Sequence, residues 1–441
     1  MKYIFILLLS AFSSQAYSAG KPNIFIISMD SFTRKPELPK NFRTELMPNL
    51  NHFTDTGYMF KNCFTENSWE HMHLWLSKIP NKIYEQSGYE LIGLGWKTHS
   101  LRRIEVEKNP ELPLNIFMNL PAESHLFELG YDYLKEKFSQ KRDKPFFLEL
   151  HIKELHPPLY IEQKINISRL TPKSRELFLK YLNSPEETPD KVTFYSVLFD
   201  ETLRQHHSPQ VMKAINKLIK LKRLPRNILQ LRFINLTIMD DLLELWKNSK
   251  GYKDDLVLMS ELYYQRQTYL DSRLPELFSL FGNKELADNT LFIIVSSFGF
   301  AMMEHGQIFD AVGVYEEFIG TNLFVKPPHT NTFKVIQEQS SLRGIGRYTR
   351  SLLESKSPPP VHENLDYIFE SEIISKNFNH DLFAIRENNT WKLHLDLVDS
   401  KRKLYDIKND PHEKNDLYQQ NLKIGADLET KLLKQLIKDE I

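Results

Sequence analysis

Four stretches of consecutive apolar residues predict buried strands. They cover residues 22–29, 144–152, 289–297 and 321–328, and two prolines end the last one. An apolar run without polar alternation is typical of a parallel strand that is covered on both faces. Helical patterns lie between these runs, for example over residues 256–281. Strands that alternate with helices predict an α/β fold with a mostly parallel sheet.

Polar residues stand at the ends of three of these strands. Asp30 directly follows the first strand, His151 lies at the end of the second, and Ser296 and Ser297 end the third. In a parallel sheet, ligands bind beyond the carboxyl ends of the strands. We therefore expect Asp30, residues 151–156 and residues 296–298 to approach one another at one edge of the sheet.

The remaining segments differ in composition. Residues 160–255 read as a helical insertion, and we interpret its basic amphipathic stretch as a solvated helix face rather than a membrane or anion contact. Residues 329–380 are predicted to be irregular, and residues 381–420 begin with strand character before a polar run. We expect a large domain over residues 20–330 and a smaller C-terminal subdomain over 331–441.

Length and charge narrow the function classes. The chain has 441 residues, with 57 basic and 57 acidic side chains and a formal net charge of +0. This length fits two or three domains, or one large α/β unit with insertions. A nucleic-acid partner is not expected, because such proteins usually carry a basic excess.

The N-terminus has the order of a signal peptide over residues 1–19. Lys2 precedes an apolar run at 3–12, and small residues at 16–18 form a cleavage pattern. The run is shorter than the ~20 residues of a membrane-spanning helix. We expect a secreted or periplasmic protein with no transmembrane segment after signal removal. The single cysteine, Cys63, excludes an intrachain disulfide, which a core of this size does not need.

Six segments, in order from Pro22 to Leu417, resemble a known family. They are "KPNIFIISMDSF", "MPNLNHFTDTGYMFKNCFT", "PFFLELHIKELHPPLY", "YYQRQTYLDSRLPELFSLF…ADNTLFIIVSS", "VGVYEEFIGTNLFVKPP" and "AIRENNTWKL…KLYDIKNDPHEKNDL". They resemble the sulfatases of the alkaline phosphatase superfamily. The resemblance implies an α/β sandwich with a large, mostly parallel sheet, helices on both faces and a small C-terminal antiparallel sheet. It also implies cleavage of sulfate esters by a formylglycine, made from a C/S-x-P-x-R motif, beside a divalent cation.

The nucleophile motif is absent from the place that the resemblance assigns to it. One register puts Glu70 at the nucleophile position, and a shift of two residues puts Ser68 there. Neither is followed by Pro and Arg at the required offsets, and Cys63 lacks both as well. Formylglycine formation is therefore not expected. Ser68 retains a role only if a metal or a base activates it toward phosphate.

The metal ligands are only partly kept. Asp30 matches the first metal carboxylate of the family, but Ser297 and Phe298 stand at the positions of a metal Asp and a metal His. A further family His falls on Asp310, whereas His156 matches the anion-binding His. A phenyl ring cannot coordinate a cation, and a hydroxyl removes most of the charge compensation. A looser alignment places Lys392 at a basic position.

These observations lead to a preferred hypothesis and two others. The preferred one is an exported pseudoenzyme that keeps the fold to bind a sulfated or phosphorylated glycan or a protein partner. A second is an active sulfuric- or phosphoric-ester hydrolase or transferase with a rebuilt metal site. The third is a structural or assembly protein built on the helical insertion.

The rebuilt site would be an enzyme site made of carboxylates and imidazoles. Catalytic candidates are Glu70, Ser68 and His156, and metal candidates are Asp30, Asp310 and His71, with His73 and His305 as further imidazoles. Such ligands suit Zn²⁺ or Mn²⁺. The cofactor stays open, with Ca²⁺, Mn²⁺ or Zn²⁺ required only if the site functions. The alternative is that these histidines are solvated or packed side chains that share no site.

Overall fold

The architecture follows from a computed structural model of the chain. It describes residues 21–32, 47–50, 56–66, 79–95, 116–119, 131, 134–136, 138–139, 144–152, 155, 170–176, 247–248, 252–282, 284–309, 313–354, 368, 370–377 and 382–439. The predicted signal peptide and most of the predicted helical insertion lie outside these residues.

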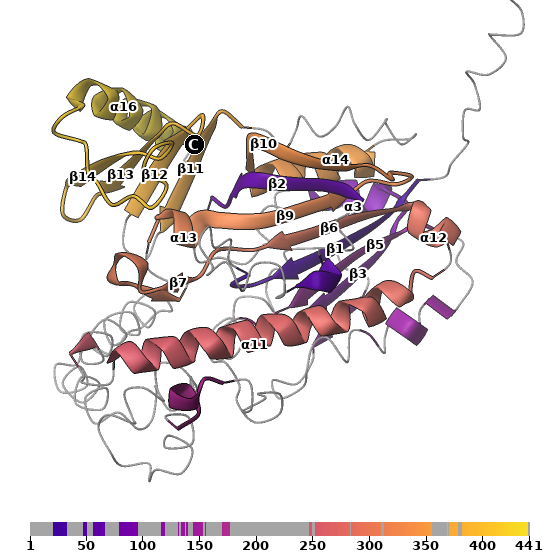
Figure 1. The fold of residues 1–441 in the computed structure, drawn as a ribbon. Helices are drawn as coiled ribbons and strands as arrows, with labels where there is room; N and C mark the ends of the chain where they lie inside the picture. The colour runs from indigo at the N-terminus through magenta and orange to yellow at the C-terminus, as the bar shows by residue number, and fades with distance from the viewer. Residues whose placement is uncertain are drawn as a thin grey trace, which may run out of the picture.

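The large sheet has eight strands in the order β10-β2-β9-β6-β1-β5-β3-β4 (Figure 1). Their bounds are β1 Asn23–Met29, β2 Gly57–Phe64, β3 Glu90–Gly95, β4 Ile116–Asn119, β5 Phe146–Ile152, β6 Thr290–Ser296, β9 Gly320–Lys326 and β10 Phe333–Ser341. The first three predicted strands are confirmed as β1, β5 and β6. The fourth, β9, is also present, but it runs antiparallel to β2 and β6 while the other neighbouring strands pair in parallel. The mostly parallel sheet is confirmed.

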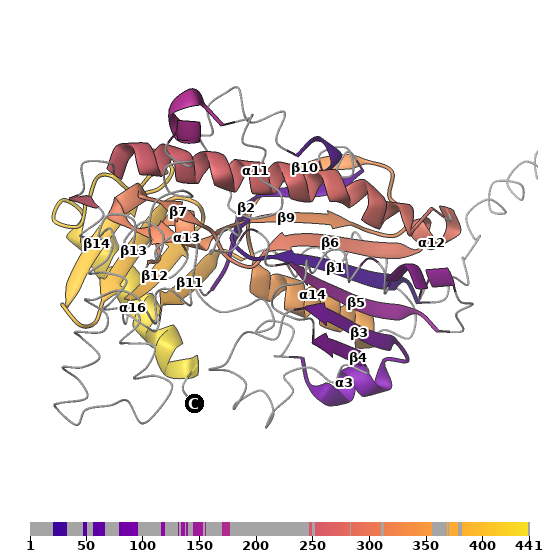
Figure 2. The same cartoon turned by 90° about the horizontal axis from the view of Figure 1, so that it is seen from below.

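Helices cover both faces of this sheet. Helix α11 (Tyr252–Ser279) runs along one face and leads to α12 (Lys284–Asp288), and α14 (Leu342–Glu354) with α3 (Asn81–Gln86) covers the other (Figures 1 and 2). Successive side chains of a strand point to opposite faces, so β1 contributes to two cores. Phe25, Ile27 and Met29 pack with α11, whereas Ile24 and Ile26 pack toward α14. This double coverage explains the unbroken apolar run in the sequence.

Short elements follow β6 and lead to β9. They are β7 (Ala301–Met302), the 3₁₀ turn η2 (Glu304–Gly306), β8 (Ile308–Phe309) and α13 (Glu316–Ile319). These elements lie on the side of the large sheet that faces the C-terminal part of the chain (Figure 1).

The C-terminal part forms a separate four-stranded antiparallel sheet. Its strands are β11 (Glu372–Asn377), β12 (Leu382–Glu387), β13 (Trp391–Asp396) and β14 (Lys401–Asp406), and α16 (Leu422–Asp439) packs on it. The small antiparallel sheet is thus confirmed.

The expectation that residues 329–380 are irregular was wrong. They contain β10, α14 and β11. Because β10 pairs with β2 and α14 packs on the large sheet, a division at residue 330 would cut through that sheet. The strands of the four-stranded sheet follow α14 in the chain. Among the described residues, no helix combines the length and apolarity needed to cross a membrane.

Candidate functional site

The carboxyl ends of β5, β1 and β6 meet at one edge of the large sheet. Ser28 pairs with His151 on β5, and Met29 pairs with Ser296 on β6. The next residue, Asp30, donates its backbone N–H to Ile152 O at 3.0 Å, and Ser297 N–H donates to Met29 O at 3.0 Å. The expected approach of Asp30, His151 and Ser297 is confirmed.

The side chains of Asp30 and His151 lie in contact at this edge. Asp30 Oδ2 lies 3.2 Å from His151 Nε2, and both side chains are buried. The distance is within ion-pair range, but the imidazole N–H is not aligned with the oxygen as in a hydrogen bond. We therefore treat the contact as electrostatic.

Two further polar groups stand behind His151. Its Nδ1 lies 2.8 Å from Ser28 Oγ, and Ser28 Oγ lies 3.5 Å from Glu149 Oε1. Glu149 and His151 are spaced by two on β5, and Asp30 follows Ser28 by two just beyond the end of β1, so each pair is directed to one side of the sheet. The result is a buried row of polar side chains running from Glu149 to Asp30.

The end of β6 is apolar where a charge was expected from the resemblance. Phe298 is buried, and the Ser297 hydroxyl is buried without a hydrogen-bond partner among the described residues. Ser296 Oγ donates to Phe298 O at 2.6 Å and fixes the turn. Gly299 comes so close to α13 that a Cβ on it would lie 1.9 Å from Glu317 O. The backbone frame of this turn thus needs the glycine.

These side chains do not fit the divalent cation that the resemblance implies. Within the described ranges, no group of three or more His, Cys, Asp or Glu side chains is placed to hold a metal ion. Ser297 is uncharged and Phe298 offers no donor atom. Asp30 alone remains of the family ligands that can be examined, with His151 as its neighbour.

Helix α11 holds the loops that follow β1. Tyr263 Oη donates to Ser31 O at 2.5 Å, where Ser31 adopts a positive φ of 57°. Asp271 accepts from the backbone N–H groups of Asn49 and Leu50 at 3.0 and 2.8 Å. Burial raises the pKa of Asp271, and the bonds from Asn49 and Leu50 oppose that rise. The segments "PNL" (48–50) and "YLD" (269–271), both part of the family resemblance, are therefore joined by hydrogen bonds.

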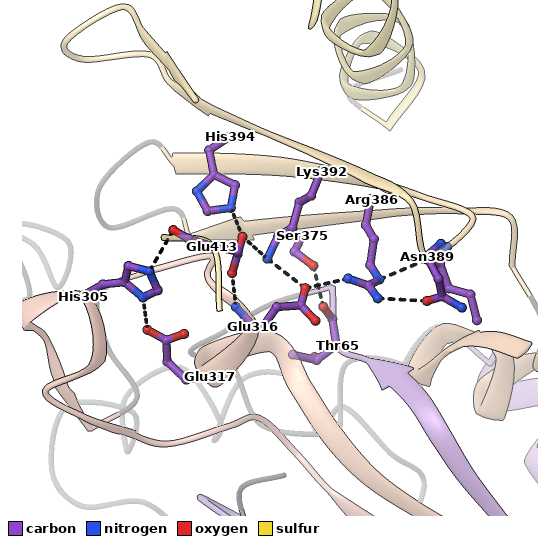
Figure 3. Close-up of polar contacts among 11 residues, drawn as sticks. Thr65, His305, Glu316, Glu317, Ser375, Arg386, Asn389, Lys392, His394 and Glu413 are labelled. Atoms are coloured by element: carbon purple, nitrogen blue, oxygen red, sulfur yellow. Dashed lines mark hydrogen bonds and ion pairs between the residues drawn. The ribbon is translucent and has the colours of Figure 1, made fainter. Parts of the chain in front are cut away.

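A second polar cluster joins the two sheets (Figure 3). Glu413 accepts from the backbone N–H of Glu316 at 2.6 Å, in the first turn of α13. Glu413 also contacts Lys392 at 2.9 Å and His394 at 2.8 Å, while Glu316 pairs with Lys392 and with Arg386 at 3.1 and 2.8 Å. Lys392 and Glu413 are both fully buried.

His305 belongs to this same cluster. Its Nδ1 lies 2.7 Å from Glu317 Oε1, its Nε2 lies 3.2 Å from Glu413 O, and its ring stacks on Tyr315 with centroids 3.7 Å apart. Both ring nitrogens are thus engaged at the joint between the sheets. This arrangement gives His305 a structural role at the joint between the sheets.

The charges of the cluster shift its pKa values in different directions. Burial works to raise the pKa of Glu413, but Lys392 and His394 outweigh it and hold that pKa well below its usual range. Burial works to lower the pKa of His305, but Glu317 and Glu413 outweigh it and raise it. For His394 burial dominates and lowers the pKa.

The other sequence candidates divide into two sets. Lys392, which a looser alignment placed at a basic position of the family, pairs with Glu316 and Glu413. Cys63 is buried in the core between β2 and α14, which agrees with its exclusion as a nucleophile. The remaining candidates lie outside the described residues: Ser68, Glu70, His71, His73, His156 and Asp310.

Sequence reasoning brought His151 to the edge where Asp30 lies but did not find Ser28 and Glu149 behind it. Ser28, Glu149 and His151 interrupt apolar strands at alternate positions. Polar residues at a spacing of two inside two adjacent strands are a usable signal, because that spacing places them on one face.

The chain resembles solved structures over nearly its whole length. An enzyme in complex with its substrate D-glucosamine-2-N,6-O-disulfate shares 15% identity, with a TM-score of 0.58 over 94% of this chain and 97% of the other. A 2-O GAG sulfatase shares 13% identity, with a TM-score of 0.62 over 95% and 92%. The phosphonate monoester hydrolase of Agrobacterium radiobacter shares 12% identity, with a TM-score of 0.60 over 95% and 96%.

At the level of sequence, no family model matches the chain, and no curated protein matches it significantly. The structural likeness alone thus carries the assignment, and at these identities it establishes the fold. The chain has the α/β fold that sulfatases and a phosphonate monoester hydrolase share, the fold of the alkaline phosphatase superfamily.

Proposed function

We propose that the chain is an exported pseudoenzyme that binds a sulfated or phosphorylated glycan at the carboxyl edge of the large sheet, without the hydrolysis performed by sulfatases. The observation that carries the proposal is the end of β6. There Ser297 and the buried ring of Phe298 follow a strand that lies directly beside Asp30. This edge has the strand arrangement of a site and lacks, at Ser297 and Phe298, two of the metal ligands that the resemblance implies.

Anion binding needs no metal at such an edge. Backbone N–H groups and a cationic side chain hold sulfate or phosphate groups, and the sequence supplies His156 at the family's anion-binding position. One solved structure of similar fold contains the substrate D-glucosamine-2-N,6-O-disulfate, and another is a 2-O GAG sulfatase. These neighbours make a sulfated sugar the first ligand class to test. Export rests on the signal-peptide pattern of residues 1–19.

One observation favours a second candidate function, an active ester hydrolase or transferase with a rebuilt metal site. Asp30 Oδ2 and His151 Nε2 lie 3.2 Å apart, and a carboxylate with an imidazole is a donor pair that Zn²⁺ and Mn²⁺ accept. The phosphonate monoester hydrolase of similar fold gives the reaction class.

One set of measurements separates the two functions. The chain without residues 1–19 is purified, its bound metal is determined by elemental analysis, and hydrolysis of aryl sulfates and aryl phosphates is assayed with Ca²⁺, Mn²⁺ and Zn²⁺. Calorimetry then compares a sulfated disaccharide with its desulfated form. The Asp30→Ala variant is compared with Asp399→Ala, whose side chain is 51% exposed on a turn.

The expected result is preferential binding of the sulfated sugar with no turnover. Stoichiometric metal together with turnover that Asp30→Ala abolishes and Asp399→Ala retains would establish the second function. A chain that neither distinguishes the two sugars nor hydrolyses an ester contradicts both.

A further inference from the structure

Two carboxylates are buried at this edge of the large sheet. Glu149 lies on β5 and Asp30 directly follows the adjacent strand β1, and each is at most 1% exposed. A buried carboxylate is costly unless a polar or charged partner compensates it. The family to which the resemblance points compensates the Asp30 position with a divalent cation. The described residues offer no ligand set for one.

His151 lies where that compensation is needed. It stands on β5 between the two carboxylates, with Nε2 3.2 Å from Asp30 Oδ2. On its other side, Nδ1 lies 2.8 Å from Ser28 Oγ, which in turn lies 3.5 Å from Glu149 Oε1. Since Ser28 holds Nδ1, the ring presents Nε2 to Asp30. The same side chains therefore fix the orientation of the imidazole as well as its position.

The residues that follow β6, the strand on the other side of β1, place no charged side chain beside Asp30. Ser297 lies beside Asp30 through its N–H bond to Met29 O, and it adds no charge. Phe298, next in the chain, is buried and apolar. On one side of β1, Ser297 and Phe298 therefore stand where the resemblance expects metal ligands, and on its other side β5 supplies a buried imidazole.

We propose that the imidazole of His151 serves as the fixed partner of Asp30 in place of a divalent cation, so that this edge of the sheet is formed without metal. The inference rests on the proposed function only for the place of the site. It concerns how that site is built, and it holds whether or not the ligand is a glycan. In this arrangement Ser28 and Glu149 are positioning residues that act through His151.

The test measures whether Asp30 and His151 stabilise each other. Urea unfolding is followed for the wild type, Asp30→Asn, His151→Leu and the double variant, without residues 1–19. If the two side chains are partners, the double variant is less destabilised than the sum of the single variants. We expect a coupling of about 5- to 30-fold in the folding equilibrium constant. Asp30→Asn combined with Asp399→Asn, on the exposed turn, is the additive control.

A second measurement begins with the wild-type chain, so its metal analysis does not depend on whether the variants fold. The wild-type chain is analysed for bound Ca²⁺, Mn²⁺ and Zn²⁺, and its unfolding midpoint is compared with and without EDTA and with each metal added. We expect no stoichiometric metal and an unchanged midpoint. The conservative His151→Gln variant, which keeps an N–H donor, should retain more stability than His151→Leu.

Three results would overturn the inference. They are one equivalent of tightly bound metal with a lower midpoint in EDTA, additivity of Asp30→Asn and His151→Leu, and equal stability of His151→Gln and His151→Leu. Sugar binding is measured separately, so a chain that shows the coupling but binds no sulfated sugar would refute the proposed function alone.

Discussion

The carboxylate of Glu413 receives the backbone N–H of Glu316 at 2.6 Å and thereby ties the C-terminal segment to the first turn of α13. The same carboxylate contacts Lys392, whose side chain is completely buried. Both Glu316 and Glu413 belong to segments that resemble the sulfatases, "VYEE" and "DPHE". These two segments thus form the joint between the sheets rather than a ligand site.

Substitution Glu413→Ala should destabilise the fold strongly. It leaves the buried Lys392 with Glu316 as its remaining ion-pair partner among the described residues, and breaking a buried pair in this way costs about 3–5 kcal/mol. Urea unfolding measures the loss. Glu429→Ala, which breaks a partly exposed pair with Arg402, is the control and should cost less than about 1 kcal/mol. Equal losses in the two variants would contradict the buried joint.

His305 should make the fold less stable as the pH rises above neutrality. Its pKa is raised in the folded state, so its contribution is complete below the unfolded value of about 6.5 and is lost as the pH rises through the folded pKa. The groups that face it are Glu317, Glu413 and Tyr315. Unfolding free energies between pH 6 and pH 9 should show this loss in the wild type and lack it in His305→Asn. A slope that survives in the variant would assign the effect to another group.

His394 should act in the opposite direction. Burial lowers its pKa, so the folded state favours the neutral ring, and its contribution is present above about 6.5 and lost as the pH falls toward the folded pKa. This contribution to the free energy of unfolding is measured by comparing His394→Gln with the wild type between pH 7 and pH 5. The wild type should lose more stability over that window than the variant does.

Gly299→Ala should be among the most damaging small substitutions at the candidate site. The added Cβ would lie 1.9 Å from Glu317 O, a backbone atom that cannot rotate away. Overpacking of this kind costs about 1–3 kcal/mol or more. Gly282→Ala is a milder control, because its nearest backbone atom lies at 3.0 Å. Similar unfolding midpoints for the two variants would show that the turn after β6 can shift.

Restoring the family residues on β6 should not be sufficient to restore a metal site. We expect Ser297→Asp with Phe298→His to bind Mn²⁺ poorly, because Asp30 still faces His151 at 3.2 Å. Adding His151→Ala should release Asp30 and allow about one equivalent to bind, as measured by calorimetry. Tight binding by the two β6 changes alone would contradict the role of His151. Failure of all three changes together would contradict the placement of Ser297 and Phe298 at the family positions.

The large sheet was predictable because each of its central strands has a simple sequence pattern. An apolar run of seven to nine residues has few alternatives to a strand buried on both faces, and β1, β5 and β6 all have one. The direction of β9 was not predictable from its own residues, since pairing depends on the neighbours. Strand β10 lies at the sheet edge and is mostly exposed in its first half, so it gives no such run.

The candidate site was predictable only in part. Asp30 was found because it follows a strand, which is a local property of the sequence. His151 was expected at the same edge, but its contacts with Ser28 and Asp30 depend on the register of two strands that lie far apart in the chain. The contact of Glu413 with Glu316 spans 97 positions in the sequence, so no local sequence pattern predicts it.

The place of β1 in the sheet has a consequence for the order in which the protein can be made. This strand is the first of the large sheet in the chain, yet it pairs along its whole length with β6, where Asn23 meets Thr290. The central strand therefore stays half-paired until most of the chain has been synthesised. Contacts between such distant residues slow folding. The large sheet is therefore expected to close late, because its central strand gains its second neighbour only when β6 is available.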